Sequence, residues 1–164
     1  MTLVLRLAGP NDAETIFAFI KELAAYEREP QAVKTTPQIL AGQLESLHPP
    51  FECVLAESAG EARGFALFFH NYSTWRGARG LYLEDLFVPA PFRGQGIGRA
   101  LLQELARIAK SRHCARMEWM VLDWNQSAIA FYQSLGAVPL HDWTVFRLSD
   151  AALDRLAATN DMIS

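Results

Sequence analysis

The 164-residue sequence contains only two cysteines and four histidines. Cys53 and Cys114 have neither the spacing of a metal site nor that of a redox pair, and the histidines are scattered without ligand spacing. We therefore expect no metal site and no disulfide, in keeping with a reducing cytosol. A chain of this length buries enough surface to be stable without such cross-links.

The sequence also lacks a long apolar run and an excess of positive charge. No stretch is long and apolar enough to span a membrane, and residues 1–9 carry too short an apolar run for a signal peptide. The formal net charge of −3 argues against a general nucleic-acid-binding protein, which is usually strongly basic. We therefore expect a soluble cytoplasmic protein that binds neither membrane nor nucleic acid.

Hydrophobic periodicity divides the chain into strands and helices without an interdomain linker. Alternating patterns predict strands over residues 3–7, 51–57, 63–70, 81–88, 114–122 and 144–148. Helical patterns follow Asn11, Thr36 and Ser149, another covers about residues 127–135, and the longest covers residues 97–112. We expect one domain, residues 1–164, of mixed α and β structure.

A glycine-rich loop joins the strand 81–88 to the longest helix. Its residues are Arg93, Gly94, Gln95, Gly96, Ile97, Gly98 and Arg99. Glycine lets the backbone approach a ligand closely, and the first amides of a helix have no internal acceptor, so a phosphate can bind there. The two arginines would add bidentate contacts. The spacing fits neither a P-loop nor a dinucleotide fingerprint, and a glycine-rich turn without a ligand is the alternative.

These residues resemble the GCN5-related N-acetyltransferase (GNAT) family. The loop is similar to the acetyl-CoA loop of that family, and Asn125 to Tyr132 resembles its asparagine-to-tyrosine helix, in the same order. Similarity to the spermidine/spermine and thialysine branch extends over Glu22–Glu27, Leu81–Val88, Trp124-Asn125 and Phe131–Ala137. The resemblance implies an α/β fold with a mixed, mostly antiparallel central sheet, helices on both faces and splayed central strands that form the coenzyme cleft.

The same resemblance implies acetyl-CoA as co-substrate and no metal. In the family, the loop amides hold the coenzyme pyrophosphate, while the end of the preceding strand binds the pantetheine arm like an added strand. Beside the loop, the residues so implicated are Leu86, Phe87, Val88, Asn125, Ala128 and Tyr132. Asn125 has an alternative as a simple helix-start residue, a role that asparagine often fills.

Two side chains match catalytic residues of the family. Tyr132 matches the general acid that protonates the departing thiolate, and Glu84 the acidic residue that takes a proton from the attacking ammonium through water. A backbone amide near Val88 would polarise the carbonyl. Adjacent strand residues point to opposite faces, so only one of Glu84 and Asp85 would face the cleft, and we favour Glu84. Tyr132 could instead be a core aromatic residue beside Phe131.

A cationic amine needs carboxylate and aromatic partners. The branch resemblance implies an amine pocket made of Tyr26, Glu27, Glu84, Asp85, Trp119, Met120 and Asp142. A solvated charge beside a buried tyrosine is the alternative for the first two, and Trp119 and Met120 could simply be core. Asp142 stands where the polyamine enzymes carry paired glutamates, so a shorter amine fits as well. The branch also implies a homodimer.

The sequence therefore predicts an acetyl-CoA-dependent N-acetyltransferase for a primary amine of a polyamine, diamine or lysine/thialysine-like amino acid. Residues 91–112 carry five basic side chains and one acidic, so the basic loop and helix suit a polyanionic coenzyme. Three alternatives remain: a protein or peptide N-acetyltransferase, a non-catalytic acetyl-CoA-binding regulatory module, and a nucleotide-binding oxidoreductase, which the glycine spacing disfavours most.

Overall fold

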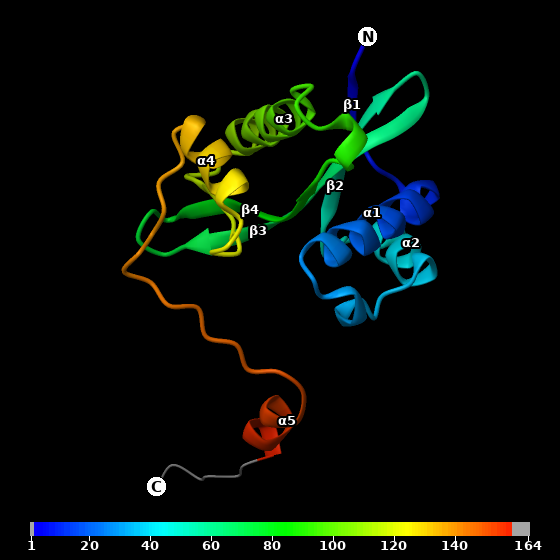
Figure 1. The fold of residues 1–164 in the computed structure, drawn as a ribbon. Coiled ribbons are helices and arrows are strands. Elements are labelled where there is room, and N and C mark those ends of the chain that lie inside the picture. Colours follow the sequence, from blue (N-terminus) through cyan, green and yellow to red (C-terminus); the bar gives the residue numbers. More distant parts are fainter. Residues whose placement is uncertain (1, 159–164) are drawn as a thin grey trace, which may run out of the picture. The chain divides into compact units, whose positions relative to one another are not determined.

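The computed structural model describes residues 2–158. They form two units, of which the first ends at Leu122 and the second begins at Asp123. The first unit contains a sheet in the order β1 (Val4–Leu7), β2 (Glu52–Ser58), β3 (Glu61–Ser73), β4 (Ala78–Phe87) and β5 (Met117–Glu118). The first four strands are antiparallel neighbours, and β5 pairs with β4 in parallel. This confirms the predicted mixed, mostly antiparallel sheet (Figure 1).

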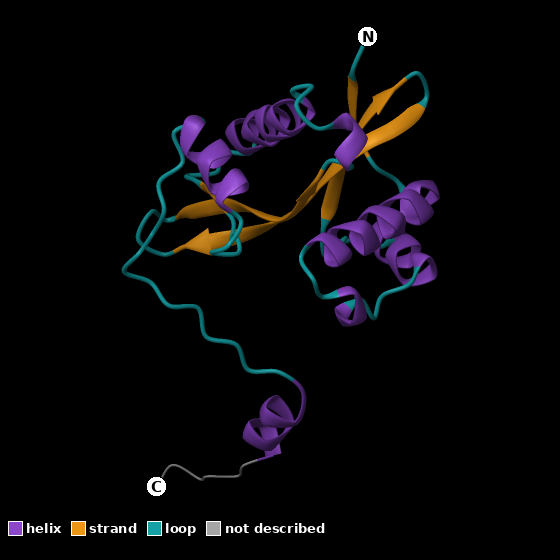
Figure 2. Ribbon diagram, viewed as in Figure 1, coloured by secondary structure: helices purple, strands orange, loops and turns teal. Residues whose placement is uncertain are grey.

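Helices cover both faces of this sheet (Figure 2). The helices α1 (Ala13–Tyr26) and α2 (Pro37–Glu45) lie on one face, and α3 (Ile97–Ser111) lies on the other. As predicted, Thr36 caps α2, because its hydroxyl accepts a hydrogen bond of 3.2 Å from the Ile39 amide and Pro37 follows at the first helical position. Three 3-10 helices connect these elements: η1 (Pro10–Asp12), η2 (Pro30–Ala32) and η3 (Ala90–Phe92).

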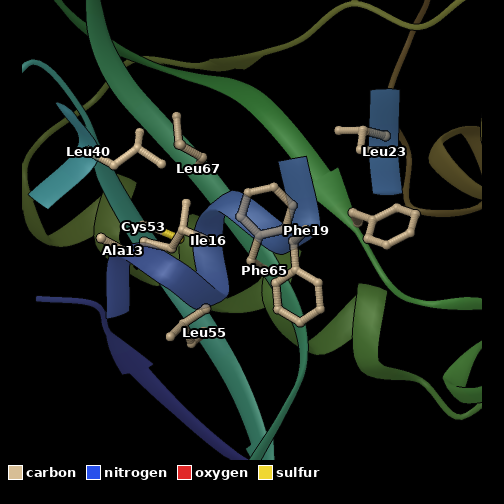
Figure 3. Close-up of a cluster of buried hydrophobic side chains, with 10 residues drawn as sticks. Ala13, Ile16, Phe19, Leu23, Leu40, Cys53, Leu55, Phe65 and Leu67 are labelled. Atoms are coloured by element: carbon tan, nitrogen blue, oxygen red, sulfur yellow. The ribbon is translucent and has the colours of Figure 1, made fainter. Parts of the chain in front are cut away.

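The main hydrophobic core lies between α1 and the sheet (Figure 3). Phe19 of α1 stacks on Phe65 of β3 with ring centroids 5.5 Å apart, and both side chains are buried. Burying one such side chain contributes about 1.5–3 kcal/mol to stability. The core is completed by Ala13, Ile16, Leu23, Leu40, Cys53, Leu55, Leu67 and Phe87. These contacts fix α1, and therefore the position of its last residues, against β4.

The apolar stripe of α3 packs on the opposite face. Its buried residues recur at helical spacing and are Ile97, Leu101, Leu102, Leu105 and Ala109. This matches the stripe that the sequence predicts for residues 97–112. Because Ile97 is both the first residue of α3 and buried, the start of the helix is held firmly at the end of β4.

The central strands diverge after a short parallel pairing. β5 pairs with β4 only at Leu81 and Tyr82, whereas β4 continues to Phe87 alongside β3. The predicted strand 114–122 is therefore wrong beyond Met117–Glu118, because a strand requires a hydrogen-bonded neighbour and residues 119–122 form no strand pairing within the first unit. This divergence confirms the predicted splay and leaves residues 83–87 of β4 unpaired on the β5 side within the first unit.

The second unit contains α4 (Gln126–Ser134) and α5 (Asp150–Ala158). Gly136 follows α4 with a φ of 88°, as its predicted role at the helix end requires. The predicted strand 144–148 is wrong, because this segment has no pairing partner within the second unit and is not in a strand. That the chain forms one domain stays a prediction. Among residues 2–158, none of the helices combines the length and apolar character needed to cross a bilayer.

Candidate active site

A β-bulge in β4 carries the two neighbouring carboxylates. The register pairs Leu67 with Asp85 and Phe68 with Leu83, so Glu84 is an extra residue without a partner opposite it in β3. Asp85 lies opposite Leu67, which belongs to the core beneath α1, and is partly buried. Glu84 is exposed. The bulge thus gives the two carboxylates different environments, and it interrupts the regular alternation from which we expected only one of them to face the cleft.

Asp85 lies in an unusual electrostatic environment. Burial, followed by repulsion from Glu84 and from Glu27, raises the pKa of Asp85 to about 6. Burial also raises the pKa of Glu27, which follows the last residue of α1. Burial and mutual repulsion both disfavour the ionised form of neighbouring carboxylates, and a bound cation offsets this cost. The first unit therefore brings together Glu27 and Asp85, which the sequence placed in one amine pocket.

Arg93 links the glycine-rich loop to α1 and β4. Its guanidinium carbon lies 4.7 Å from the ring centroid of Tyr26 and 5.6 Å from that of Phe87. Its Nε donates a 2.8 Å hydrogen bond to the carbonyl oxygen of Val88. The sequence suggested Arg93 only as a phosphate ligand, whereas the structure also shows it as an anchor of the loop.

The loop itself fits an anionic ligand. Gly94 and Gly96 have φ angles of 74° and 81°, which residues with a side chain rarely adopt. Gly96 has no side chain that could cap α3, so within residues 2–158 the N-cap residue offers no side-chain acceptor to the first amides of the helix. A Cβ atom built at either glycine would meet nothing within 4 Å, so the loop is open on that side. The residues present therefore match a pyrophosphate cradle at a helix N-terminus.

A second arginine supports the segment in front of the loop. The guanidinium carbon of Arg63 lies 4.3 Å from the ring centroid of Phe92, the last residue of η3. Both side chains line a cavity of about 80 Å³, together with Leu3, Ser58, Gln95 and Ile97. This cavity is far smaller than the 300–1,000 Å³ typical of a ligand site, so it is too small to be the candidate active site. No sequence motif pointed to Arg63.

The second unit places Asn125, Ala128 and Tyr132 along α4. Asn125 caps the helix, because its Oδ1 accepts a 3.3 Å hydrogen bond from the Ala128 amide. This confirms the helix-start role of Asn125 and leaves its coenzyme role a prediction. Tyr132 is partly buried, with its ring centroid 5.4 Å from that of Phe131.

The remaining predicted pocket residues lie outside regular structure. Trp119 and Met120 follow β5 in the first unit, where Trp119 is partly buried and Met120 is 55% exposed. Asp142 is an exposed residue of the second unit, between α4 and α5. Within residues 2–158, no three His, Cys, Asp or Glu side chains gather as potential ligands of a metal ion.

Comparisons with known proteins agree with this geometry. Residues 16–137 match the Acetyltransferase (GNAT) family. The chain is 35% identical to a thialysine N-epsilon-acetyltransferase of Bos taurus, with 94% of this chain and 96% of that protein aligned. It is also 35% identical to the human spermidine/spermine N(1)-acetyltransferase-like protein 1, over 88% of this chain and 22% of that protein. Among solved structures, an integron cassette protein from the V. cholerae mobile metagenome is similar, with a TM-score of 0.81, 27% identity and coverage of 97% and 99% of the two chains.

Proposed function

Because the chain belongs to the Acetyltransferase (GNAT) family, we propose that it transfers the acetyl group of acetyl-CoA to a primary amine of a small cationic substrate. The observation that carries this proposal is the pairing of an anion cradle with a carboxylate pocket in one unit. Arg93 joins them, because it belongs to the loop that forms the cradle and contacts Tyr26 beside Glu27. A transferase for these two substrates needs one site for a polyanion and an adjacent site for a cation.

The coenzyme occupies the cradle and the splayed edge of β4. The uncapped start of α3 supports binding of the pyrophosphate by the loop amides, aided by Arg99. The unpaired side of β4 supports binding of the pantetheine arm along Leu86, Phe87 and Val88 by strand addition. Asn125, Ala128 and Tyr132 of the second unit are the further coenzyme-binding residues that the family resemblance implies.

The reaction is a direct transfer. The amine nitrogen attacks the thioester carbonyl carbon, the new C–N bond forms and the C–S bond breaks. Glu84 takes the ammonium proton through water, which its exposure at the bulge supports. The Val88 amide polarises the carbonyl oxygen. Tyr132 gives a proton to the departing sulfur and regains one from the nitrogen, which loses its second proton as it becomes the amide. Positioned proton transfers of this kind contribute about 10²–10⁴-fold in rate.

The amine binds between the carboxylates. Glu27 and Asp85 attract its positive charge, and the raised pKa of both groups supports a site that a cation stabilises. Tyr26, Trp119 and Met120 of the first unit line this pocket, and Asp142 of the second unit is the further amine-binding residue that the branch resemblance implies. The relatives named for thialysine and for spermidine/spermine support a flexible aliphatic chain that ends in a primary amine.

A turnover assay with an amine panel tests this function. Thiol release from acetyl-CoA is measured with thialysine, lysine, spermidine, spermine and a short diamine, and with a lysine-containing peptide and a protein N-terminal peptide as separate arms. We expect turnover with at least one small amine and none with the peptides. Turnover with the peptides alone would favour a protein acetyltransferase. Coenzyme binding without turnover of any acceptor would favour a regulatory module.

We further propose a homodimer in the cytoplasm. Val145 and Phe146 of the second unit are 65% and 92% exposed, and apolar side chains in such positions support contact with another copy of the chain. Light scattering of the purified protein at several concentrations measures its mass, and a monomer at every concentration would contradict the dimer. Cell fractionation tests the location.

A further inference from the structure

Gly64 of β3 lies where the end of β4 and the start of α3 meet. A Cβ atom built on Gly64 would lie 2.9 Å from the carbonyl oxygen of Phe87, 3.1 Å from Cγ2 of Val88 and 3.4 Å from Cγ2 of Ile97. Real Cβ atoms essentially never approach another heavy atom within 3.0 Å. Gly64 is not among the glycines with positive φ, so the position requires glycine for lack of space and not for its backbone conformation.

The closest of these contacts involves one particular peptide bond. The carbonyl oxygen of Phe87 and the amide N–H of Val88 belong to the same planar group, so a displacement of the oxygen also moves the N–H. The next carbonyl, that of Val88, accepts the hydrogen bond from Arg93 Nε at 2.8 Å. Val88 is therefore held on both sides, by close packing against Gly64 and by the anchored arginine.

We propose that Gly64 is a positioning residue that sets the place of the Val88 amide in acetyl transfer. This inference rests on the proposed function, in which that amide polarises the thioester carbonyl. Without a side chain, Gly64 lets the Phe87–Val88 peptide settle directly on β3. An added methyl group pushes this peptide outward, because a backbone oxygen cannot rotate away as a flexible side chain can. The Val88 amide then no longer donates to the thioester carbonyl oxygen in the geometry that transition-state stabilisation requires.

The test compares Gly64→Ala with the wild type and with Gly42→Ala as a matched control. Gly42 lies within α2, and a methyl group there meets nothing within 4 Å. For each protein, kcat is measured with the best acceptor of the amine panel, and the acetyl-CoA dissociation constant is measured by calorimetry. We expect kcat of Gly64→Ala to fall about 100-fold, as when one oxyanion donor is misplaced. The dissociation constant should rise far less, because the pyrophosphate cradle and the rest of the pantetheine arm still bind. Gly42→Ala should retain the kcat of the wild type.

Two results would overturn the proposal. One is a folded Gly64→Ala protein with the kcat of the wild type. The other is a loss of coenzyme affinity as large as the loss of kcat, which would place the effect on coenzyme binding and not on the transfer step. If Gly64→Ala does not fold, the double variant Gly64→Ala/Val88→Ala is compared with Val88→Ala, because it relieves the 3.1 Å contact and keeps the one to the Phe87 oxygen. The double variant should show the same loss of kcat relative to Val88→Ala, and an equal kcat would overturn the proposal.

A wild type that binds acetyl-CoA without acetylating any amine would refute the proposed function, a result distinct from these.

Discussion

Replacing Asp85 with asparagine should stabilise the folded protein and weaken its binding of the amine. Burial and the neighbouring carboxylates raise the pKa of Asp85 from its usual 3.8 to about 6. The folded protein therefore binds this proton more tightly than the unfolded chain does. Below pH 3.8 the carboxyl is neutral in both states and has no effect. As the pH rises from 3.8 to 6, ionisation increasingly favours the unfolded chain, and above pH 6 the loss is constant.

The size of the effect follows from the difference between the two pKa values. A difference of about two pH units corresponds to about 3 kcal/mol at neutral pH, since each unit contributes about 1.4 kcal/mol. Asparagine has nearly the same shape and cannot ionise, so Asp85→Asn should gain about this free energy of unfolding at pH 7. For a chain of this size, such a gain in the free energy of unfolding raises Tm by about 6–12 °C. The amine should bind more weakly, because the charge that attracts it is gone.

Urea denaturation at two pH values measures this directly. We expect the free energy of unfolding of Asp85→Asn to exceed that of the wild type by about 3 kcal/mol at pH 7 and by less than about 1 kcal/mol at pH 4. Glu22→Gln, which removes an exposed carboxylate of α1, is the control and should stay within about 0.5 kcal/mol at both pH values. An Asp85→Asn protein no more stable than the wild type at pH 7, or equally stabilised at both pH values, would refute the reasoning.

Three further measurements test other parts of the account. In steady-state kinetics of the wild type, KM for the amine should rise as the pH falls through about 6, because protonated Asp85 no longer attracts the cation, and Asp85→Asn should lose this dependence. A wild-type KM for the amine that stays constant as the pH falls through about 6 would contradict a role of Asp85 in attracting the cation. Tyr132→Phe should lower kcat by about 10²–10⁴-fold and leave acetyl-CoA binding largely intact in calorimetry, and an unchanged kcat would exclude the general-acid role. Thr36→Ala should lower the free energy of unfolding by about 1 kcal/mol in urea, because the Ile39 amide loses its cap, and equal stability would show that this cap contributes nothing.

The loop and its helix could be predicted from the sequence because their causes are local. The left-handed conformation of Gly96 and the apolar spacing of α3 depend on neighbouring residues. The same holds for the cap of α2 by Thr36. The motifs around these elements also carried the family resemblance, which the comparisons confirm.

The rest depends on partners that are distant in the sequence. Residues 144–148 have a strand pattern, yet a pattern does not supply the neighbouring strand that pairing requires. The pKa of Asp85 depends on the bulge at Glu84 and on Glu27, which lies almost sixty positions away and comes near through the packing of α1. Gly64 carries no motif, and its role follows only from the space left by β4 and α3.

The central claim is that this chain acetylates a small primary amine with acetyl-CoA. Mass spectrometry of the acceptor, after incubation with purified protein and acetyl-CoA carrying a labelled acetyl group, tests it most directly. The account predicts a labelled acetyl group on the amine nitrogen of thialysine, spermidine or another small amine of the panel, formed only with intact protein. Protein that binds acetyl-CoA and leaves every amine of the panel unlabelled would contradict it.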